Sequence, residues 1–213
     1  MRINAEEKLA AIVIADVADY AGLVARDPAG AKAALQLQHH EVIDAAIAIY
    51  GGRIFELEDD RTLAEFTSPL AALRCAVEIQ ERLEQRAAAL PSAARIRLRI
   101  GVHYGEVLVD RGEITGGALV IAKRVQALAE PGEICVSRTV VDAVKKRVEH
   151  CYCDLAGLGR PVPKAGLAFR LEVAPDTSRR RAPAWLGAAG RLALTAVVVA
   201  AAIWLAMTHG GPG

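Results

Sequence analysis

The chain is poor in aromatic residues and has no marked excess of either charge. Aromatic side chains make up 4% of its 213 residues, and 26 Lys and Arg face 25 Asp and Glu, for a net charge of +1. Basic residues form no stripe with interleaved aromatics, so the sequence predicts no nucleic-acid-binding surface. The length suits one well-packed domain with an appendage.

Cysteines are also few, and none has the spacing of a metal site. The four are Cys75, Cys135, Cys151 and Cys153, with no C-x-x-C pair and no histidine close enough to complete a zinc pattern. We therefore expect reduced, buried cysteines that act as small hydrophobic side chains in a cytosolic domain.

One long apolar run stands out, at residues 184–208. It carries a single charge, Arg191, and follows a linker, 176–183, with three consecutive arginines. As a helix its 24 residues from 184 to 207 would span ~36 Å, against ~30 Å for the hydrocarbon core of a bilayer. The sequence predicts a single-pass helix in the inner (cytoplasmic) membrane, with residues 1–175 in the cytoplasm and a short tail, 209–213. A buried or interfacial helix is the alternative, against which the lack of a polar face argues.

Residues 1–175 alternate strand and helix patterns. Strands are expected at residues 9–17, 53–57, 62–66, 95–109, 133–137, 150–155 and 168–173. Helices are expected at residues 27–50, from 68–69 onward, 118–129 and 137–147. The segment 95–109 is expected to bend at Gly101 and Gly105 into an antiparallel pair. This order predicts an α+β fold with helices on one face of a mainly antiparallel sheet, around a ferredoxin-like β-α-β-β-α-β core with a C-terminal extension.

Acidic residues crowd the turn between the strands expected at 53–57 and 62–66. Hairpins usually turn on Gly or Asn, but this turn holds Glu58, Asp59 and Asp60. The pattern fits either a metal site or a solvated loop.

Several segments resemble the class III adenylate/guanylate cyclase catalytic domain, from about Leu9 to Val173. The strongest is RIGVHYGEV, residues 99–107. The others are ADVADY (15–20), GGRI (51–54), AVEIQ (76–80) and ALAEPGEICVSRTV (127–140). The resemblance implies an enzyme that joins the ribose 3′-oxygen of ATP or GTP to its own α-phosphate and releases pyrophosphate. It also implies a dimer in which one subunit supplies metal carboxylates and the other supplies base, ribose and transition-state contacts.

The resemblance further implies a site for Mg²⁺ or Mn²⁺. Its ligands would be Asp16, the backbone carbonyl of Val17, and Asp60. Asp59 and Arg61 replace the glycines that usually flank the second aspartate, and Arg61 could pair with a neighbouring acid and compete with the metal. A solvated acidic turn remains the alternative.

The same resemblance places the phosphate contacts. Asp19 stands in the phosphate-binding turn, where the family usually has a small residue and a carboxylate would repel a triphosphate. Arg160 and Lys164 are both candidates for the cation that binds the triphosphate.

The base, ribose and transition-state positions are only partly retained. Glu56 replaces the adenine-specifying Lys and is similar to guanylate cyclases, and Glu113 falls at the second base-contacting position. The two carboxylates suit guanine or reflect structural drift. Val120 occupies the position of the ribose-orienting Asn, and Arg124 occupies that of the transition-state Arg.

Three functions remain open at this point. The chain is an active, membrane-anchored nucleotide cyclase with a diverged site, working as a homodimer. Alternatively, it is a degenerate subunit that donates the metal-binding half to a heterodimer or acts as a non-catalytic regulator. The third reading is a membrane-tethered interaction module without a nucleotide.

Overall fold

In the computed structural model, the residues that are described lie within Met1–Val173. The described residues are 6–88, 90, 95–147, 151–155 and 168–172. The expected linker, transmembrane helix and tail lie outside them, so these remain predictions. None of the helices among the described residues combines the length and the apolar character needed to cross a bilayer.

Strands and helices follow the expected order closely. The strands are β1 (Glu6–Val17), β2 (Arg53–Leu57), β3 (Arg61–Phe66), β4 (Leu98–Asp110), β5 (Glu113–Thr115), β6 (Ile134–Ser137), β7 (Cys151–Asp154) and β8 (Ala168–Glu172). The helices are α1 (Tyr20–Arg26), α2 (Pro28–Gln38), the π-helix η1 (His39–Asp44), α3 (Ala45–Ile49), α4 (Pro69–Ala87), α5 (Gly117–Ala127) and α6 (Arg138–Val144).

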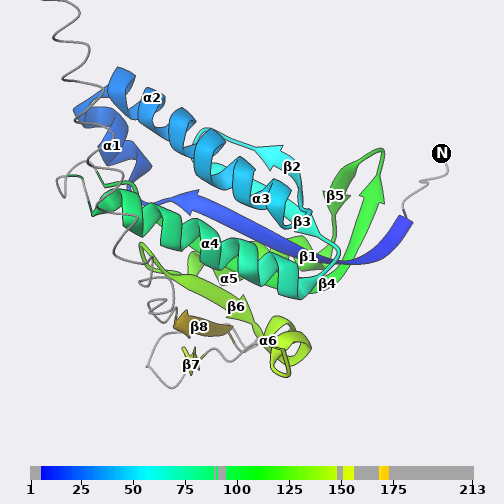
Figure 1. The fold of residues 1–213 in the computed structure, drawn as a ribbon. Helices are drawn as coiled ribbons and strands as arrows, with labels where there is room; N and C mark the ends of the chain where they lie inside the picture. The colour runs from blue at the N-terminus through cyan, green and yellow to red at the C-terminus, as the bar shows by residue number, and fades with distance from the viewer. Residues whose placement is uncertain (1–5, 89, 91–94, 148–150, 156–167, 173–213) are drawn as a thin grey trace, which may run out of the picture. The chain divides into compact units, whose positions relative to one another are not determined.

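The strands form one sheet in the order β2-β3-β1-β4-β6-β8-β7, with β5 added to the end of β4 (Figure 1). Only β4 and β6 pair in parallel among the described strands. The mainly antiparallel α+β arrangement is therefore confirmed. In the centre, β1 lies between β3 and β4 and pairs with β4 along its whole length.

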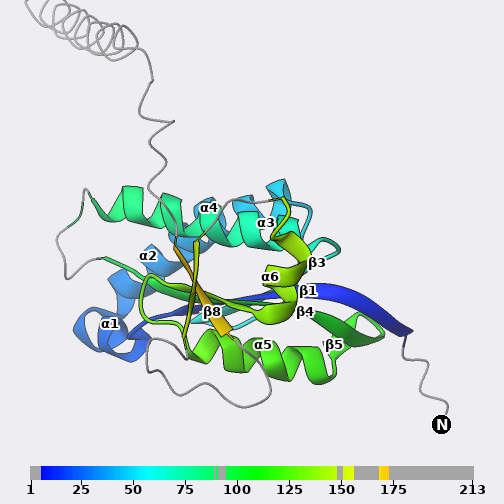
Figure 2. The same ribbon diagram turned by 90° about the horizontal axis from the view of Figure 1, so that it is seen from below.

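Helices cover both faces of the sheet, so the prediction of helices on a single face was wrong. On β1, Val13 faces the cluster that α3, α4 and α6 complete, whereas Ile12 packs with Ala118 and Ala122 of α5. Figure 2 shows α4 and α5 on opposite sides of the sheet. The physical reason lies in the continuous apolar run of β1, which exposes hydrophobic surface on both faces and needs cover on both.

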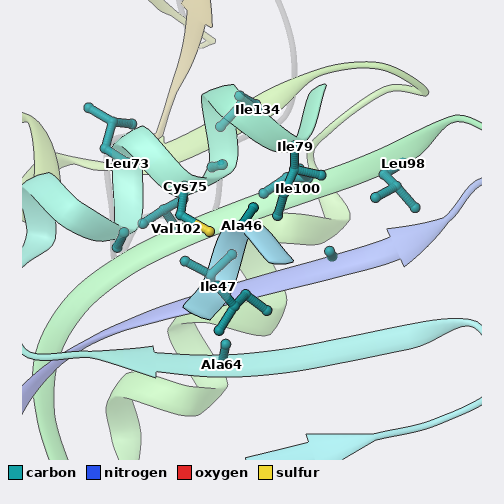
Figure 3. Close-up of a cluster of buried hydrophobic side chains, with 14 of the residues drawn as sticks. Ala46, Ile47, Ala64, Leu73, Cys75, Ile79, Leu98, Ile100, Val102 and Ile134 are labelled. Carbon is teal, nitrogen blue, oxygen red and sulfur yellow. The ribbon is translucent and has the colours of Figure 1, made fainter. Parts of the chain in front are cut away.

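The larger core lies between the sheet and the helices α3 and α4. Figure 3 shows Ile47 and Ile79 from these helices meeting Ile100 and Val102 of β4. Cys75 is buried in this core, and its burial, together with nearby Glu78, raises its thiol pKa to about 12. Cys75 and Cys135 are both free and buried, as expected. The side chains of Cys151 and Cys153 lie outside the described part of the chain.

The expected bend at Gly101 and Gly105 does not occur, because β4 is one continuous strand. A Cβ at Gly101 would lie 2.5 Å from the backbone N and Cα of Gln126 in α5. At Gly105 a Cβ would lie 2.9 Å from Nε2 of His103. These glycines allow close packing of a helix and an imidazole against the strand, rather than a turn.

The helix expected at residues 27–50 is interrupted. Asp27 caps α2 as predicted, since its Oδ1 accepts from the Gly30 N–H at 3.0 Å. The π-helix η1 then breaks the α-helical register before α3. Its first residue, His39, lies 2.9 Å from the hydroxyl of Thr62, measured from Nε2 to Oγ1. A π-helical turn of this kind has no clear signature in the sequence.

Candidate functional site

Asp16, at the end of β1, is flanked by an arginine on each neighbouring strand. The register sets Asp16 opposite Arg61 of β3 and opposite Arg99 of β4. Nη2 of Arg61 donates to Oδ1 of Asp16 at 3.4 Å, and Nη2 of Arg99 donates to Oδ2. The Asp16 side chain is only 5% exposed. Its buried carboxylate is thus compensated by two guanidinium groups.

The two guanidinium groups determine whether Asp16 can bind a divalent cation. Two unit charges about 4 Å apart interact by about 4 kcal/mol at an effective dielectric constant of about 20. A cation bound to Asp16 would meet that repulsion from each guanidinium, and doubly so for a +2 ion. In the described part of the chain, no cluster of three or more His, Cys, Asp or Glu side chains could hold a metal ion. With Arg61 in place, the residues around Asp16 do not fit Mg²⁺ or Mn²⁺.

The acidic turn lies beside the end of β1 but opens toward the other face of the sheet. The Val17 N–H donates to the Asp60 carbonyl at 2.8 Å. Asp60 lines a small hollow together with Ala15, Val17 and His39. Side chains alternate along a strand, so Asp16 points to the α5 face. Asp16 is not among the residues that line this hollow, although its ion-pair partner Arg61 is. The role of Asp60 as a metal ligand stays a prediction.

The expected phosphate-binding turn is occupied by a carboxylate. Asp19 precedes α1 with a φ of 56°, in the left-handed region. Its side chain lies so close to Gly22 that a Cβ there would collide with it. It also pairs with Arg26 at 3.3 Å. Arg160 and Lys164, the two candidates for a triphosphate contact, lie outside the described residues.

The two base-contacting candidates lie apart. A bulge in β2 sets Glu56 opposite Leu63, whose side chain belongs to the cluster under α5, so Glu56 faces the same side as Asp16. Glu113 is exposed on β5, and its neighbour Ile114 turns toward that cluster. No hydrogen bond or ion pair between described residues joins the two glutamates.

Val120 and Arg124 lie one turn apart on the exposed side of α5. Val120 is 50% exposed, and Arg124 is also exposed and forms no hydrogen bond or ion pair with another described residue. The opposite side of the helix packs on the sheet through Ala118 and Ala122. The expected ribose and transition-state positions therefore face outward, where a second chain or a ligand can reach them.

One residue of the site had no assigned role in the sequence interpretation. Arg99 lies within RIGVHYGEV, yet its partnership with Asp16 depends on the β1–β4 register. Alternation along the strand shows only that Arg99 lies on the face opposite Leu98 and Ile100. The distance of 83 residues between Asp16 and Arg99 explains why sequence spacing could not pair them.

Comparisons with known proteins agree with this architecture. No protein-family model matches the chain. It is 32% identical over 160 residues to a putative adenylate cyclase 3 of Rhizobium meliloti, a match that covers 73% of this chain and 27% of that protein. Three curated relatives are matched over 27%, 16% and 31% of their length, so the chain spans less than a third of each.

Solved structures extend the likeness to the fold. The adenylyl cyclase CyaB from P. aeruginosa shares it at a TM-score of 0.68 and 17% identity, over 81% of this chain and 98% of that chain. An adenylate/guanylate cyclase/hydrolase from Silicibacter pomeroyi has a TM-score of 0.72 and 37% identity. That match covers 80% of this chain and all of the other, 100%. The identity of 37%, sustained over the whole of that chain at a TM-score of 0.72, places this chain in the class III adenylate/guanylate cyclase catalytic-domain family.

Proposed function

We propose that the chain acts in cyclic-nucleotide signalling as a cyclase-family subunit that binds ATP or GTP at a diverged site and turns it over weakly alone. The observation that carries this proposal is Val120, which stands exposed one helical turn from Arg124. Valine cannot hydrogen-bond a ribose. The loss of one preorganised polar contact of this kind typically costs about 3–4 kcal/mol, or about 10²–10³ in rate.

Pairing with a second subunit is part of the proposal. Arg124 and Val120 face outward on α5, whereas Asp16 lies near the sheet end, so one chain presents two separate half-sites. In a homodimer, Val120 would be present at both active sites, so both would lack the ribose contact. A heterodimer with a subunit that holds the missing ribose contact would repair one of its two sites.

Nucleotide choice follows from the chemistry of Glu56. A carboxylate accepts hydrogen bonds from the N1 and N2 groups of guanine, whereas N1 of adenine is itself an acceptor. GTP is therefore the better match of the two substrates. Among the structural neighbours, a guanylate cyclase domain of RhGC from Catenaria anguillulae is in complex with GTP, at 18% identity and a TM-score of 0.64.

Membrane anchoring belongs to the same proposal. The apolar run 184–208 and the arginines of the linker 176–183 support a single-pass helix, with the cyclase-family domain on the cytoplasmic side. Fractionation of cells that produce the full chain tests this. The protein should stay in the membrane pellet after a carbonate wash, and recovery in the supernatant would contradict the anchor.

A second candidate function is a non-catalytic regulator that binds nucleotide or a partner subunit without turnover. The observation that favours it is the pairing of Asp16 with Arg61 and Arg99. Such a subunit would change the activity of a catalytic partner. In a turnover assay of this chain alone, Asp16→Asn and the wild type would have the same activity.

The test is turnover of ATP and GTP by the full chain in detergent, beside the double variant Glu56→Lys with Val120→Asn. Mn²⁺ is kept well above about 1 mM, so that the metal ion can compete with Arg61 at Asp16. We expect slow turnover in the wild type and a rise of about 10²-fold or more in the double variant with ATP. Ile49→Asn is the matched control, since Ile49 is 65% exposed on α3, away from the candidate positions. Fast wild-type turnover would contradict the diverged site. No nucleotide binding to either protein in calorimetry would contradict the proposed function as a whole.

A further inference from the structure

The charges around Asp16 form a closed arrangement. Its carboxylate receives one guanidinium from each neighbouring strand, and its side chain is 5% exposed. Arg61 is also held at a second point, because its Nη1 donates to Oε2 of Glu58 at 3.3 Å. Arg61 therefore bridges the acidic turn and the end of β1, with its side chain only 32% exposed.

We propose that Arg61 is a built-in counter-ion that takes the place of a divalent cation at Asp16. The end of β1 is charge-balanced by the protein itself, and Mg²⁺ or Mn²⁺ must displace a guanidinium to bind there. The inference rests on the proposed function only in locating the nucleotide site at this end of the sheet. It concerns metal affinity, which is measurable without turnover.

Arg61, rather than Arg99, determines the charge balance around Asp16. Arg99 contacts Asp16 through Nη2, and its buried Nε has no hydrogen-bond partner among the described residues. Arg61 also compensates Glu58 and stands directly beside Asp60 in the chain. Removal of Arg61 leaves the carboxylates of the turn and of Asp16 with one cation fewer, which favours uptake of a metal ion.

The test is titration of the full chain in detergent with Mn²⁺ alone, followed by calorimetry and by the electron paramagnetic resonance signal of free Mn²⁺. The wild type should bind no Mn²⁺ at Asp16 up to about 1 mM. Arg61→Gly should gain a Mn²⁺ site at Asp16 whose affinity is at least about tenfold tighter than this wild-type limit. The gain should disappear when Asp16→Asn is added, and Arg61→Lys, which keeps the positive charge, should not show it.

The matched control is Arg138→Ala, which removes one arginine from an exposed ion pair with Asp142 on α6. It should leave Mn²⁺ binding as in the wild type. A similar gain in this control would show a general charge effect and overturn the proposal. Tight Mn²⁺ binding to the wild type that Asp16→Asn abolishes would also overturn it.

Folding of the variants is checked by circular dichroism. If Arg61→Gly shows no thermal unfolding transition, Arg61→Gln takes its place, because glutamine removes the charge and is tolerated in a strand. Arg61→Gln must then gain Mn²⁺ affinity in the same way. A folded Arg61→Gln without that gain contradicts the inference. Fast wild-type nucleotide turnover would contradict the proposed function alone, because the metal titration still decides the role of Arg61.

Discussion

The imidazole of His103 lies 2.9 Å from the hydroxyl of Ser137, measured from Nδ1 to Oγ, and so joins the parallel strands β4 and β6. The hydroxyl of Ser137 also lies 2.9 Å from that of Thr139, which donates to the Tyr104 carbonyl at 2.7 Å. Ser137 precedes α6, as expected from the sequence. Its hydroxyl makes no hydrogen bond that caps the helix, because its contacts with His103 and Thr139 use it.

Burial lowers the pKa of His103 from 6.5 to about 4, which makes stability depend on pH. The unfolded chain takes up a proton near pH 6.5 while the folded chain resists it, so stability is full above pH 6.5 and falls as the pH drops toward 4. The loss reaches about 3 kcal/mol. Urea unfolding at pH 7.5 and 4.5 should show a steeper decline for the wild type than for His103→Gln. Parallel declines would contradict this role.

Close packing at Gly101 predicts an unequal effect of two alanine substitutions. A Cβ at Gly101 would collide with the backbone of Gln126, so Gly101→Ala should lower the free energy of unfolding by about 2–3 kcal/mol or more. At Gly117, the first residue of α5, a Cβ would meet nothing within 4 Å. Gly117→Ala should be neutral or stabilising by up to about 1 kcal/mol. Equal denaturation midpoints for the two variants would contradict the tight contact.

The ion pairs of Glu65 should stabilise the pairing of β3 with its neighbours β1 and β2. Its side chain is 10% exposed, Lys8 reaches it at 2.8 Å and Arg53 at 2.6 Å. Burial raises the pKa of Glu65, but the hydrogen bonds and charges of both partners outweigh burial and bring the pKa below 4.5. The partners are 39% and 48% exposed, which screens the interaction. Glu65→Gln should therefore lower the free energy of unfolding by about 1–2 kcal/mol at pH 7.

The effect of Glu65→Gln should disappear in acid. A lowered pKa means that the stabilisation is present above pH 4.5 and is lost as the pH falls through the folded-state pKa. Thermal unfolding of wild type and variant at pH 7 and pH 3 measures this difference. Asp142→Asn, in an exposed pair with Arg138, is the control and should change stability little at either pH. A difference that persists unchanged at pH 3 would point to packing instead of charge.

The turn between β4 and β5 predicts a stabilising substitution. Arg111 and Gly112 have φ values of 52° and 90°, the left-handed pair that two-residue hairpins favour. Asparagine adopts this conformation more readily than arginine. Arg111→Asn should raise the free energy of unfolding by about 0.5–1 kcal/mol. A lower denaturation midpoint would show that the arginine side chain contributes more than the strain of its backbone removes.

Local signals predicted most elements because each depends on neighbours in the chain. The apolar run ending at Asp16 is β1, and Asp27 before Pro28 and Ser68 before Pro69 mark helix starts. The π-helix η1 and the unbroken strand β4 were missed. Both depend on contacts with distant residues, such as Thr62 beneath His39 and Gln126 against Gly101.

The candidate site also has one part that the sequence indicated and another that only the structure shows. The family resemblance indicated Asp16, Val120 and Arg124 as candidate site residues, and these assignments stay predictions. The relatives support the cyclase family itself. The spacing of Val120 and Arg124 was enough to put both on one side of a helix, because four residues make about one turn.

By itself the sequence determined which side chains are available: a strand-end aspartate, an acidic turn followed by Arg61, and Val120 one helical turn before Arg124. Only the tertiary structure decided how they are paired. The register of three strands carries Arg61 and Arg99 to the two sides of Asp16, and strand alternation turns Asp16 away from the hollow that Asp60 lines. Strand register and the choice of sheet face come from packing between segments far apart in the chain, so no local pattern encodes them.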